Sequence, residues 1–155
     1  MSFPAKAKSA YNFTKNFYGK YVTFIEKYAS SILLLTIRIF IGLVFFKSGL
    51  VKFSNIEQTI ILFEYEYEVP FLSPQFAAIS SLIVELGCGA LIMAGLLTRI
   101  IALPLIGLTL VIQLLVFQNP EHFYWLFLLS TLAVFGGGKL SADGLGSLIC
   151  KLKNK

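Results

Sequence analysis

The sequence has few of the side chains that soluble enzymes use for chemistry. It contains one histidine and two cysteines, Cys88 and Cys150, and no Cys-x-x-Cys pair. A single imidazole cannot supply the ligand cluster of a zinc site or a pair of haem ligands. Cysteines at mid-span and in the tail cannot reach each other to form a disulfide. We therefore predict no metal, no covalently bound cofactor and no thiol redox centre in this chain.

Charged residues are also scarce. They make up 14% of the 155 residues, whereas hydrophobic residues make up 57%, and about a quarter of the residues of a soluble domain are charged. The mean hydropathy is +0.79. This composition indicates an integral membrane protein, with room for one bundle of about four spans at roughly 20 residues each.

Four apolar segments are candidates for membrane-spanning helices. They cover residues 31–53, 76–97, 100–116 and 123–138. The last two are short, so we expect flanking residues to extend them or the bilayer to thin there, with re-entrant or half-buried helices as the alternative. The predicted fold class is an all-α membrane protein, a four-transmembrane-helix bundle over 31–143. An N-terminal segment, 1–30, precedes it, and a basic cytoplasmic tail, 144–155, follows it.

Lysine and arginine flank these segments on one side only. They lie before the first span, in the turn between the second and third, and after the fourth. The loops on the other side contain no lysine or arginine and carry the glutamates 57, 64, 66, 68 and 121. This asymmetry predicts that both termini are cytoplasmic. It also accounts for the net charge of +5, which we therefore do not interpret as a nucleic-acid-binding surface.

Aromatic residues between Ala10 and Ser30 recur at helical spacing and share one face. They are Phe13, Phe17, Tyr21, Phe24 and Tyr28, and the remaining face holds Lys15, Asn16, Lys20, Glu26 and Lys27. The pattern predicts an amphipathic interfacial helix on the cytoplasmic leaflet, where basic residues meet anionic lipid. A helix that docks on a partner subunit needs the same stripe, so this alternative stays open.

Isolated charges mark a candidate site. Glu85 lies near the middle of the second apolar segment, and Arg38 and Lys47 lie inside the first. A charge at bilayer depth costs roughly 3 kcal/mol on insertion scales, so such residues normally pair inside a bundle. The helical rise places Arg38 about 10 Å and Glu85 about 16 Å above the cytoplasmic edge. We therefore predict a buried Arg38–Glu85 pair between the first two spans, with fixing of helix register as the alternative to a functional role.

Four other polar residues lie in or next to the predicted spans. Lys47 lies on the side of the helix opposite Arg38, so it either snorkels or faces another helix or a partner. Lys52 is expected to snorkel to the outer edge. Gln113 in the third span faces lipid or bundle, and the sequence does not decide between them. His122 is interpreted as a solvated interfacial residue.

The loop after the first span alternates acids and aromatics over residues 64–68, at the period-two spacing of a strand. Such a segment could cap the bundle, neutralise Lys47 and Lys52, or attract a cationic solute or a periplasmic partner. A solvated loop with aromatics at the interface is the simpler alternative.

Several motifs resemble those of the DoxX-like family of small membrane proteins. They are Arg38, Gly42, Phe45-Phe46, Gly49 and Lys52-Phe53 in the first span, Glu85-Leu86, Gly89, Leu91, Gly95-Leu96 and Thr98-Arg99 around the second, and the closing turn Gly136-Gly137-Gly138-Lys139-Leu140-Ser141-Ala142-Asp143. The resemblance covers roughly residues 33–143, while Lys47 and the N-terminal helix depart from the pattern. It implies a multi-pass four-helix bundle of the bacterial inner membrane. The family includes a subunit of a thiosulfate:quinone oxidoreductase and components linked to oxidative-stress complexes.

Two functions follow from these observations. The first is a non-catalytic, accessory subunit of a quinone-linked oxidoreductase, in which a quinone headgroup enters between helices. Glu85 handles protons, and Arg38 either keeps the carboxylate ionised or polarises a carbonyl. The sequence assigns no catalytic residue. The alternative is a non-enzymatic membrane scaffold or a small-solute transport module. Besides the lipid bilayer, the expected partner is a membrane or periplasmic protein, and homo-oligomerisation through the Gly-rich faces stays open.

Overall fold

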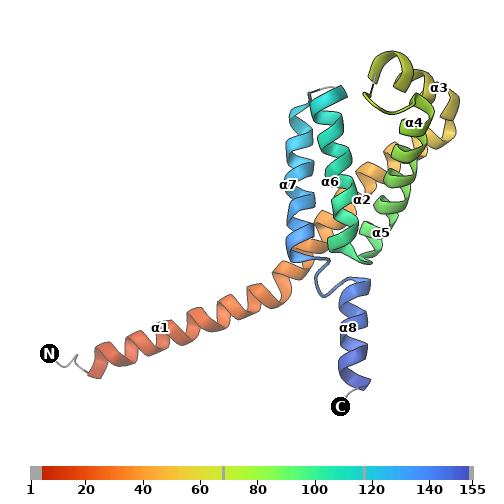
Figure 1. Ribbon diagram of the computed structural model, residues 1–155. Helices are drawn as coiled ribbons and strands as arrows, with labels where there is room; N and C mark the ends of the chain where they lie inside the picture. Colours follow the sequence, from red (N-terminus) through yellow and green to blue (C-terminus); the bar gives the residue numbers. More distant parts are fainter. Residues whose placement is uncertain (1–4, 68, 117, 154–155) are drawn as a thin grey trace.

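The computed structural model describes residues 5–67, 69–116 and 118–153, and side chains for 14–25, 28–67, 69–116, 118–150 and 152–153. All regular structure in this part of the chain is helical, as predicted (Figure 1). The elements are α1 (Ala5–Phe24), η1 (Ile25–Ala29), α2 (Ser30–Ser54), α3 (Ile56–Leu62), η2 (Phe63–Tyr67), α4 (Pro74–Ile83), η3 (Val84–Cys88), α5 (Gly89–Ala94), α6 (Thr98–Val111), η4 (Ile112–Val116), α7 (Pro120–Phe135) and α8 (Ala142–Lys153). The η elements are short π-helical turns that continue the neighbouring α-helices.

Three helices within the described residues are long and apolar enough to cross a membrane: Ser30–Ser54, Pro74–Ala94 and Thr98–Val116. Their bounds agree with the first three predicted spans to within a few residues. The fourth predicted span corresponds to α7, which has 16 residues and therefore extends about 24 Å. This is shorter than a hydrocarbon core of roughly 30 Å, so the structure supports three spans by length, with α7 packed beside them.

The core lies where α2, α5, α6 and α7 pack side by side (Figure 1). Its buried residues are Ile41, Phe45, Ile92, Ala102, Leu105, Leu129 and Leu132. Lipid tails are as apolar as these side chains, so association of the helices depends on close van der Waals packing rather than on hydrophobic burial.

Glycines give α2 and α5 this close approach. A Cβ atom on Gly89 would lie 2.9 Å from the backbone nitrogen of Phe46, and one on Gly42 would lie 3.0 Å from the carbonyl oxygen of Gly89. Gly49 lies against Leu86 in the same way. The first two membrane-length helices therefore pack closely along these glycines.

Helix α1 leads into α2 through η1, and it extends away from the bundle (Figure 1). Phe17, Tyr21, Phe24 and Tyr28 are exposed along it. The predicted places of Phe13, Glu26 and Lys27 on its two faces lie outside the described side chains. The segment is helical, and its amphipathic, interfacial role stays a prediction.

The segment after α2 folds over one end of the bundle (Figure 1). The strand spacing expected for residues 64–68 is wrong for the described positions, because Phe63–Tyr67 forms the helical turn η2. Phe63 packs on Ala77 of α4 and its ring lies 5.0 Å from that of Tyr67, one helical turn away. These contacts favour a helix. Glu68 lies outside the described residues.

The predicted basic tail is helical in its described part. Helix α8 projects from the end of the bundle opposite the α3–η2 cap (Figure 1). Leu145, Leu148, Ile149 and Leu152 are exposed along it at helical spacing.

Candidate functional site

Arg38 and Glu85 do not pair, so the predicted ion pair is wrong. The Arg38 guanidinium donates hydrogen bonds to the carbonyl oxygens of Leu140 at 2.5 Å and of Met93 at 3.5 Å. The carboxylate of Glu85 instead binds Lys52. Helix ends leave backbone carbonyls without partners, and Arg38 lies level with the end of α5, where such acceptors are available.

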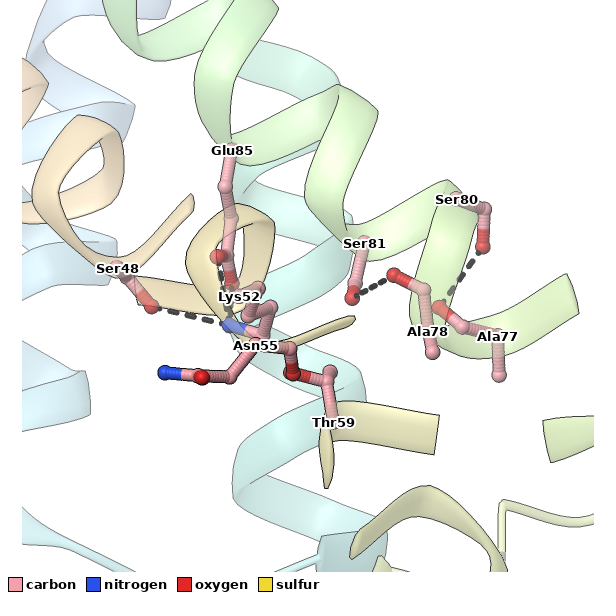
Figure 2. A network of polar contacts seen from close by, with 9 residues as sticks. All are labelled: Ser48, Lys52, Asn55, Thr59, Ala77, Ala78, Ser80, Ser81 and Glu85. Atoms are coloured by element: carbon pink, nitrogen blue, oxygen red, sulfur yellow. Dashed lines mark hydrogen bonds and ion pairs between the residues drawn. The ribbon is translucent and has the colours of Figure 1, made fainter. Parts of the chain in front are cut away.

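Lys52 and Glu85 form the polar centre of the site (Figure 2). The Lys52 ammonium lies 2.6 Å and 2.8 Å from the two carboxylate oxygens of Glu85 and 3.0 Å from Ser48 Oγ. An ammonium has three donors, and all three have an acceptor here. The expectation that Lys52 snorkels outward is therefore wrong: its long stem runs back along α2, and the charge is held inside the bundle.

The pair is well shielded from solvent. The side chain of Glu85 is 3% exposed and that of Lys52 is 17% exposed. Glu85 belongs to the π-helical turn η3, which interrupts the helix that starts at α4. Such turns are frequent at functional sites, because the wider turn changes the direction in which a side chain projects.

The polar groups around Glu85 on the same helix are satisfied locally. Ser81 Oγ donates to the carbonyl oxygen of Ala78 at 2.9 Å, and Ser80 Oγ donates to that of Ala77 at 3.1 Å (Figure 2). Neither serine donates to Glu85. The carboxylate therefore relies on Lys52.

The ion pair forms part of the wall of a cavity of about 380 Å³ between the helices. Its apolar wall includes Val44, Phe45, Val84, Leu108, Ile112 and Trp125. Phe63, Tyr67, Val69 and Leu72 close it on the side of the α3–η2 cap. The combination of a mostly apolar wall with a few convergent polar groups is typical of small-molecule sites, as is the volume.

His122 also lines this cavity, and the sequence interpretation of it as a solvated residue is wrong. It is 2% exposed, and its Nδ1 lies 2.7 Å from Gln113 Oε1. The same Oε1 accepts the backbone N–H of Asn119 at 3.1 Å, which identifies it as the oxygen of the amide. A neutral His122 therefore donates from Nδ1 and has Nε2 as an acceptor. Gln113 faces the bundle.

Tyr67 contributes a phenol to the wall below the cap. Burial raises the pKa of Tyr67, and the charges of Glu66 and Glu85 raise it further. The phenol therefore stays protonated at neutral pH and can donate a hydrogen bond into the cavity.

Arg38 belongs to a second polar cluster at the opposite end of the bundle. Gly95 has a φ of 73°, and a Cβ there would collide with the Arg38 guanidinium. The Asp143 carboxylate accepts the N–H groups of Leu97 at 2.8 Å and Thr98 at 3.0 Å, and so caps the start of α6. The N–H of Asp143 in turn donates to the carbonyl oxygen of Gly95 at 3.1 Å. These contacts join the α5–α6 turn to the closing turn, which gives the cluster a structural role.

The remaining candidates lie outside both clusters. Lys47 is exposed on α2 and does not reach the cavity. Arg99 is exposed and lies across Gly136, with its Nε 3.1 Å from where a Cβ of that glycine would be. The structure thus brings Lys52 and Glu85 from the predicted set to one cavity and adds His122 and Tyr67 to its wall. Gln113 does not line the cavity but holds His122.

Comparisons with known proteins point to one family. A family model described as DoxX matches residues 33–118. The chain is also 35% identical over 116 residues to a Bacillus subtilis (strain 168) protein named "Putative oxidoreductase CatD", a match that covers 70% of this chain and 83% of that protein. No solved structure matches the chain. The family match includes Lys52, Glu85 and Gln113 and ends before His122.

Proposed function

Because this chain belongs to the DoxX family of membrane proteins, we propose that it is an accessory subunit of a quinone-linked oxidoreductase. It binds the quinone headgroup in the cavity beside Lys52 and Glu85. In this proposal α7 completes a four-span bundle in the bacterial inner membrane, and both termini are cytoplasmic. The name of the Bacillus subtilis relative agrees with a link to redox chemistry.

The observation that supports this proposal most is a buried ion pair on the wall of an apolar, aromatic cavity. A quinone headgroup is planar and apolar apart from its two carbonyl oxygens, so the wall around Phe45 and Trp125 fits its faces and the polar groups fit its edges. A bound quinone would take up two electrons and two protons and so become a quinol. A partner protein in the membrane or periplasm would exchange the electrons.

The residues of the chain supply binding and proton handling. Lys52 Nζ is the donor for a carbonyl oxygen, and it can turn from Ser48 Oγ to a ligand without leaving Glu85. The Glu85 carboxylate, held by Lys52, is the proton acceptor next to the ligand.

The geometry gives less support to solute passage, one form of the alternative function. Beyond the cavity, towards Arg38, the bundle is filled by Ile41, Ile92, Leu105 and Leu132, which have no exposed surface. A continuous polar path through the bundle would have to open this layer. The scaffold form of the alternative requires no ligand, and the experiment below separates it from the proposal.

Trp125 gives the direct test, since it is the single tryptophan of the chain and lines the cavity. Short-tailed ubiquinone and menaquinone analogues are titrated into the detergent-purified protein while Trp125 fluorescence is recorded, with free tryptophan amide correcting for light absorption. We expect saturable quenching that weakens at least tenfold in Glu85→Gln and in Lys52→Met, because one hydrogen bond to a charged group contributes about 1.5–3 kcal/mol.

The control is Lys47→Gln, which removes a lysine from the exposed face of the same helix and should bind as wild type does. Far-UV circular dichroism establishes that each variant is folded. Quenching that does not saturate in wild type, or that is equal in all the variants, would refute the proposal and favour the scaffold.

A further inference from the structure

A second cavity lies at the end of the bundle opposite Lys52 and Glu85, and the proposed function does not use it. It is a groove of about 720 Å³ between the starts of α2 and α6, the end of α7, the closing turn and α8. Its lining includes Leu34, Arg99, Ile100, Phe135, Lys139 and Leu148.

The groove is electropositive. Arg99 and Lys139 both line it and both are exposed, and no hydrogen bond or ion pair engages either one within the described part of the chain. Asp143 is the acid on its wall, but both of its carboxylate oxygens accept backbone N–H groups of the α5–α6 turn. Two cations therefore face the groove against one carboxylate that is already hydrogen-bonded.

The closing turn brings Lys139 to the groove that Arg99 also lines. Gly136 and Gly138 both have a φ of 76°, a conformation that side chains disfavour. The missing side chain of Gly136 leaves room for Arg99, and Gly138 lies where a Cβ would approach Leu34 to 3.2 Å. The turn thereby folds against α2 and brings Lys139 to the groove that Arg99 lines.

The groove continues into an apolar surface. Ile100 is 62% exposed and Phe135 is 66% exposed. They lie on the neighbouring helices α6 and α7, at the start of α6 and at the end of α7. Leu148 of α8 adds an exposed apolar side chain across the groove. A ligand that fits this site has an anionic head and a hydrocarbon tail.

We infer that this groove binds an anionic phospholipid, whose phosphate lies between Arg99 and Lys139 and whose acyl chain lies along Ile100 and Phe135. Arg99 stands at the start of the membrane-length helix Thr98–Val116, and Lys139 of the closing turn lines the same groove, so the two cations mark the level of the lipid headgroups. Basic pockets between transmembrane helices bind such headgroups. A free phosphate ion would use the two cations but not the apolar surface.

Native mass spectrometry of the full chain released from detergent tests this inference. Dioleoyl phosphatidylglycerol and dioleoyl phosphatidylcholine, which differ only in the headgroup, are compared as probes. We expect the first to bind more tightly, with a loss of roughly fivefold for each charge removed in Arg99→Gln and Lys139→Gln and about twenty-fold in the double variant. Arg99→Lys should keep most of the affinity, and Lys47→Gln, a matched loss of charge elsewhere on the bundle, should keep all of it.

Three results would overturn the inference. The first is equal retention of the two lipids by wild type, and the second is unchanged phosphatidylglycerol binding in a double variant with the wild-type circular dichroism spectrum. The third is displacement of the lipid by millimolar inorganic phosphate, which would mean that the groove binds a simple anion rather than a lipid. Retention that survives phosphate and falls with the two charges would support it.

Discussion

The buried ion pair leads to an asymmetric expectation for the free energy of unfolding. Removing the charge of Lys52 should lower this free energy more than removing the charge of Glu85. Removing both charges should lower it less than removing that of Lys52 alone. The two single variants are Lys52→Met, which keeps the stem, and Glu85→Gln, which keeps the shape. The third variant combines the two substitutions.

The magnitudes follow from exposure. In Lys52→Met, Glu85 keeps a carboxylate that is 3% exposed, and neither nearby serine donates to it. Breaking a buried pair in this way costs about 3–5 kcal/mol. In Glu85→Gln, Lys52 still donates to Ser48 and to the amide oxygen. Its side chain is already 17% exposed and can turn outward, so we expect about 1–2 kcal/mol.

The double variant leaves no charge buried. Replacement of both members of a buried pair by neutral groups of similar size is often close to neutral, so its loss should resemble that of Glu85→Gln, about 1–2 kcal/mol. The second substitution is then expected to restore roughly 2 kcal/mol to Lys52→Met.

Unfolding by sodium dodecyl sulfate in mixed micelles, followed by far-UV circular dichroism, measures these differences. Lys47→Met is the matched control and should lie within about 0.5 kcal/mol of wild type, because this lysine is on the exposed face of α2. The reasoning would be refuted if the double variant were less stable than Lys52→Met. It would also be refuted if the loss of stability in the double variant equalled the sum of the losses in the two single variants.

Three further predictions concern the turns and the cap. Asp143→Asn should lower the free energy of unfolding by about 1–2 kcal/mol in the same assay, because it weakens the cap at the start of α6; an unchanged midpoint would contradict this role. Gly95→Ala should lower the yield of folded protein sharply, since its φ is 73° and a Cβ would collide with Arg38. Gly107→Ala, in open space on α6, should be neutral or stabilising by up to about 1 kcal/mol; equal yields of the two variants would contradict this. Because burial and nearby carboxylates raise the pKa of Tyr67, the stability from its neutral phenol is complete below about pH 10 and is lost as the pH rises further. Tyr67→Phe should therefore unfold less readily than wild type at alkaline pH, and equal midpoints there would contradict the shift.

Much of the helical framework could be predicted because its signals are local in the sequence. The long apolar runs give the three membrane-length helices, and Gly42 and Gly49 recur at helical spacing on one face of the first. Glu85 could be identified as a candidate because an acid in the middle of an apolar span is conspicuous whatever surrounds it.

The partner of Glu85 could not be predicted in the same way. Depth along the helix favoured Arg38, but Arg38 binds backbone carbonyls of Met93 and Leu140, and carbonyl acceptors leave no mark in a sequence. Lys52 was expected to snorkel because it lies near a helix end. The turn that follows α2 folds over that end and encloses it, and this tertiary contact overrides the local rule.

His122 was missed although two signals pointed to it. Asn119-Pro120 is a typical helix start, which places His122 in the first turn of α7. Gln113 is an amide in an apolar run, and a buried amide needs a hydrogen-bond partner. His122 is a polar side chain available across the short turn, so the two residues could have been paired from the sequence.

The two cations of α2 have different tasks, and their chemistry explains which residue stands where. Arg38 and Lys52 lie roughly four helical turns apart and within about 40° of each other around the axis. Arg38 has a rigid, planar fork of donors and uses it to join backbone carbonyls from two turns. Backbone carbonyls do not titrate, so the hydrogen bonds of Arg38 join the two turns without any exchange of protons.

Lys52 is a point charge on a flexible stem, and its acceptors are side-chain oxygens of Glu85 and Ser48. These side-chain oxygens can rotate, unlike the backbone carbonyls that Arg38 binds. A ligand in the cavity therefore competes for Lys52 only if it offers an acceptor oxygen at least as good as the Ser48 hydroxyl. A pure hydrocarbon would leave the ion pair intact, whereas a carbonyl compound would engage it. Under the proposed function, the headgroup chemistry rather than the shape of the cavity therefore selects the ligand.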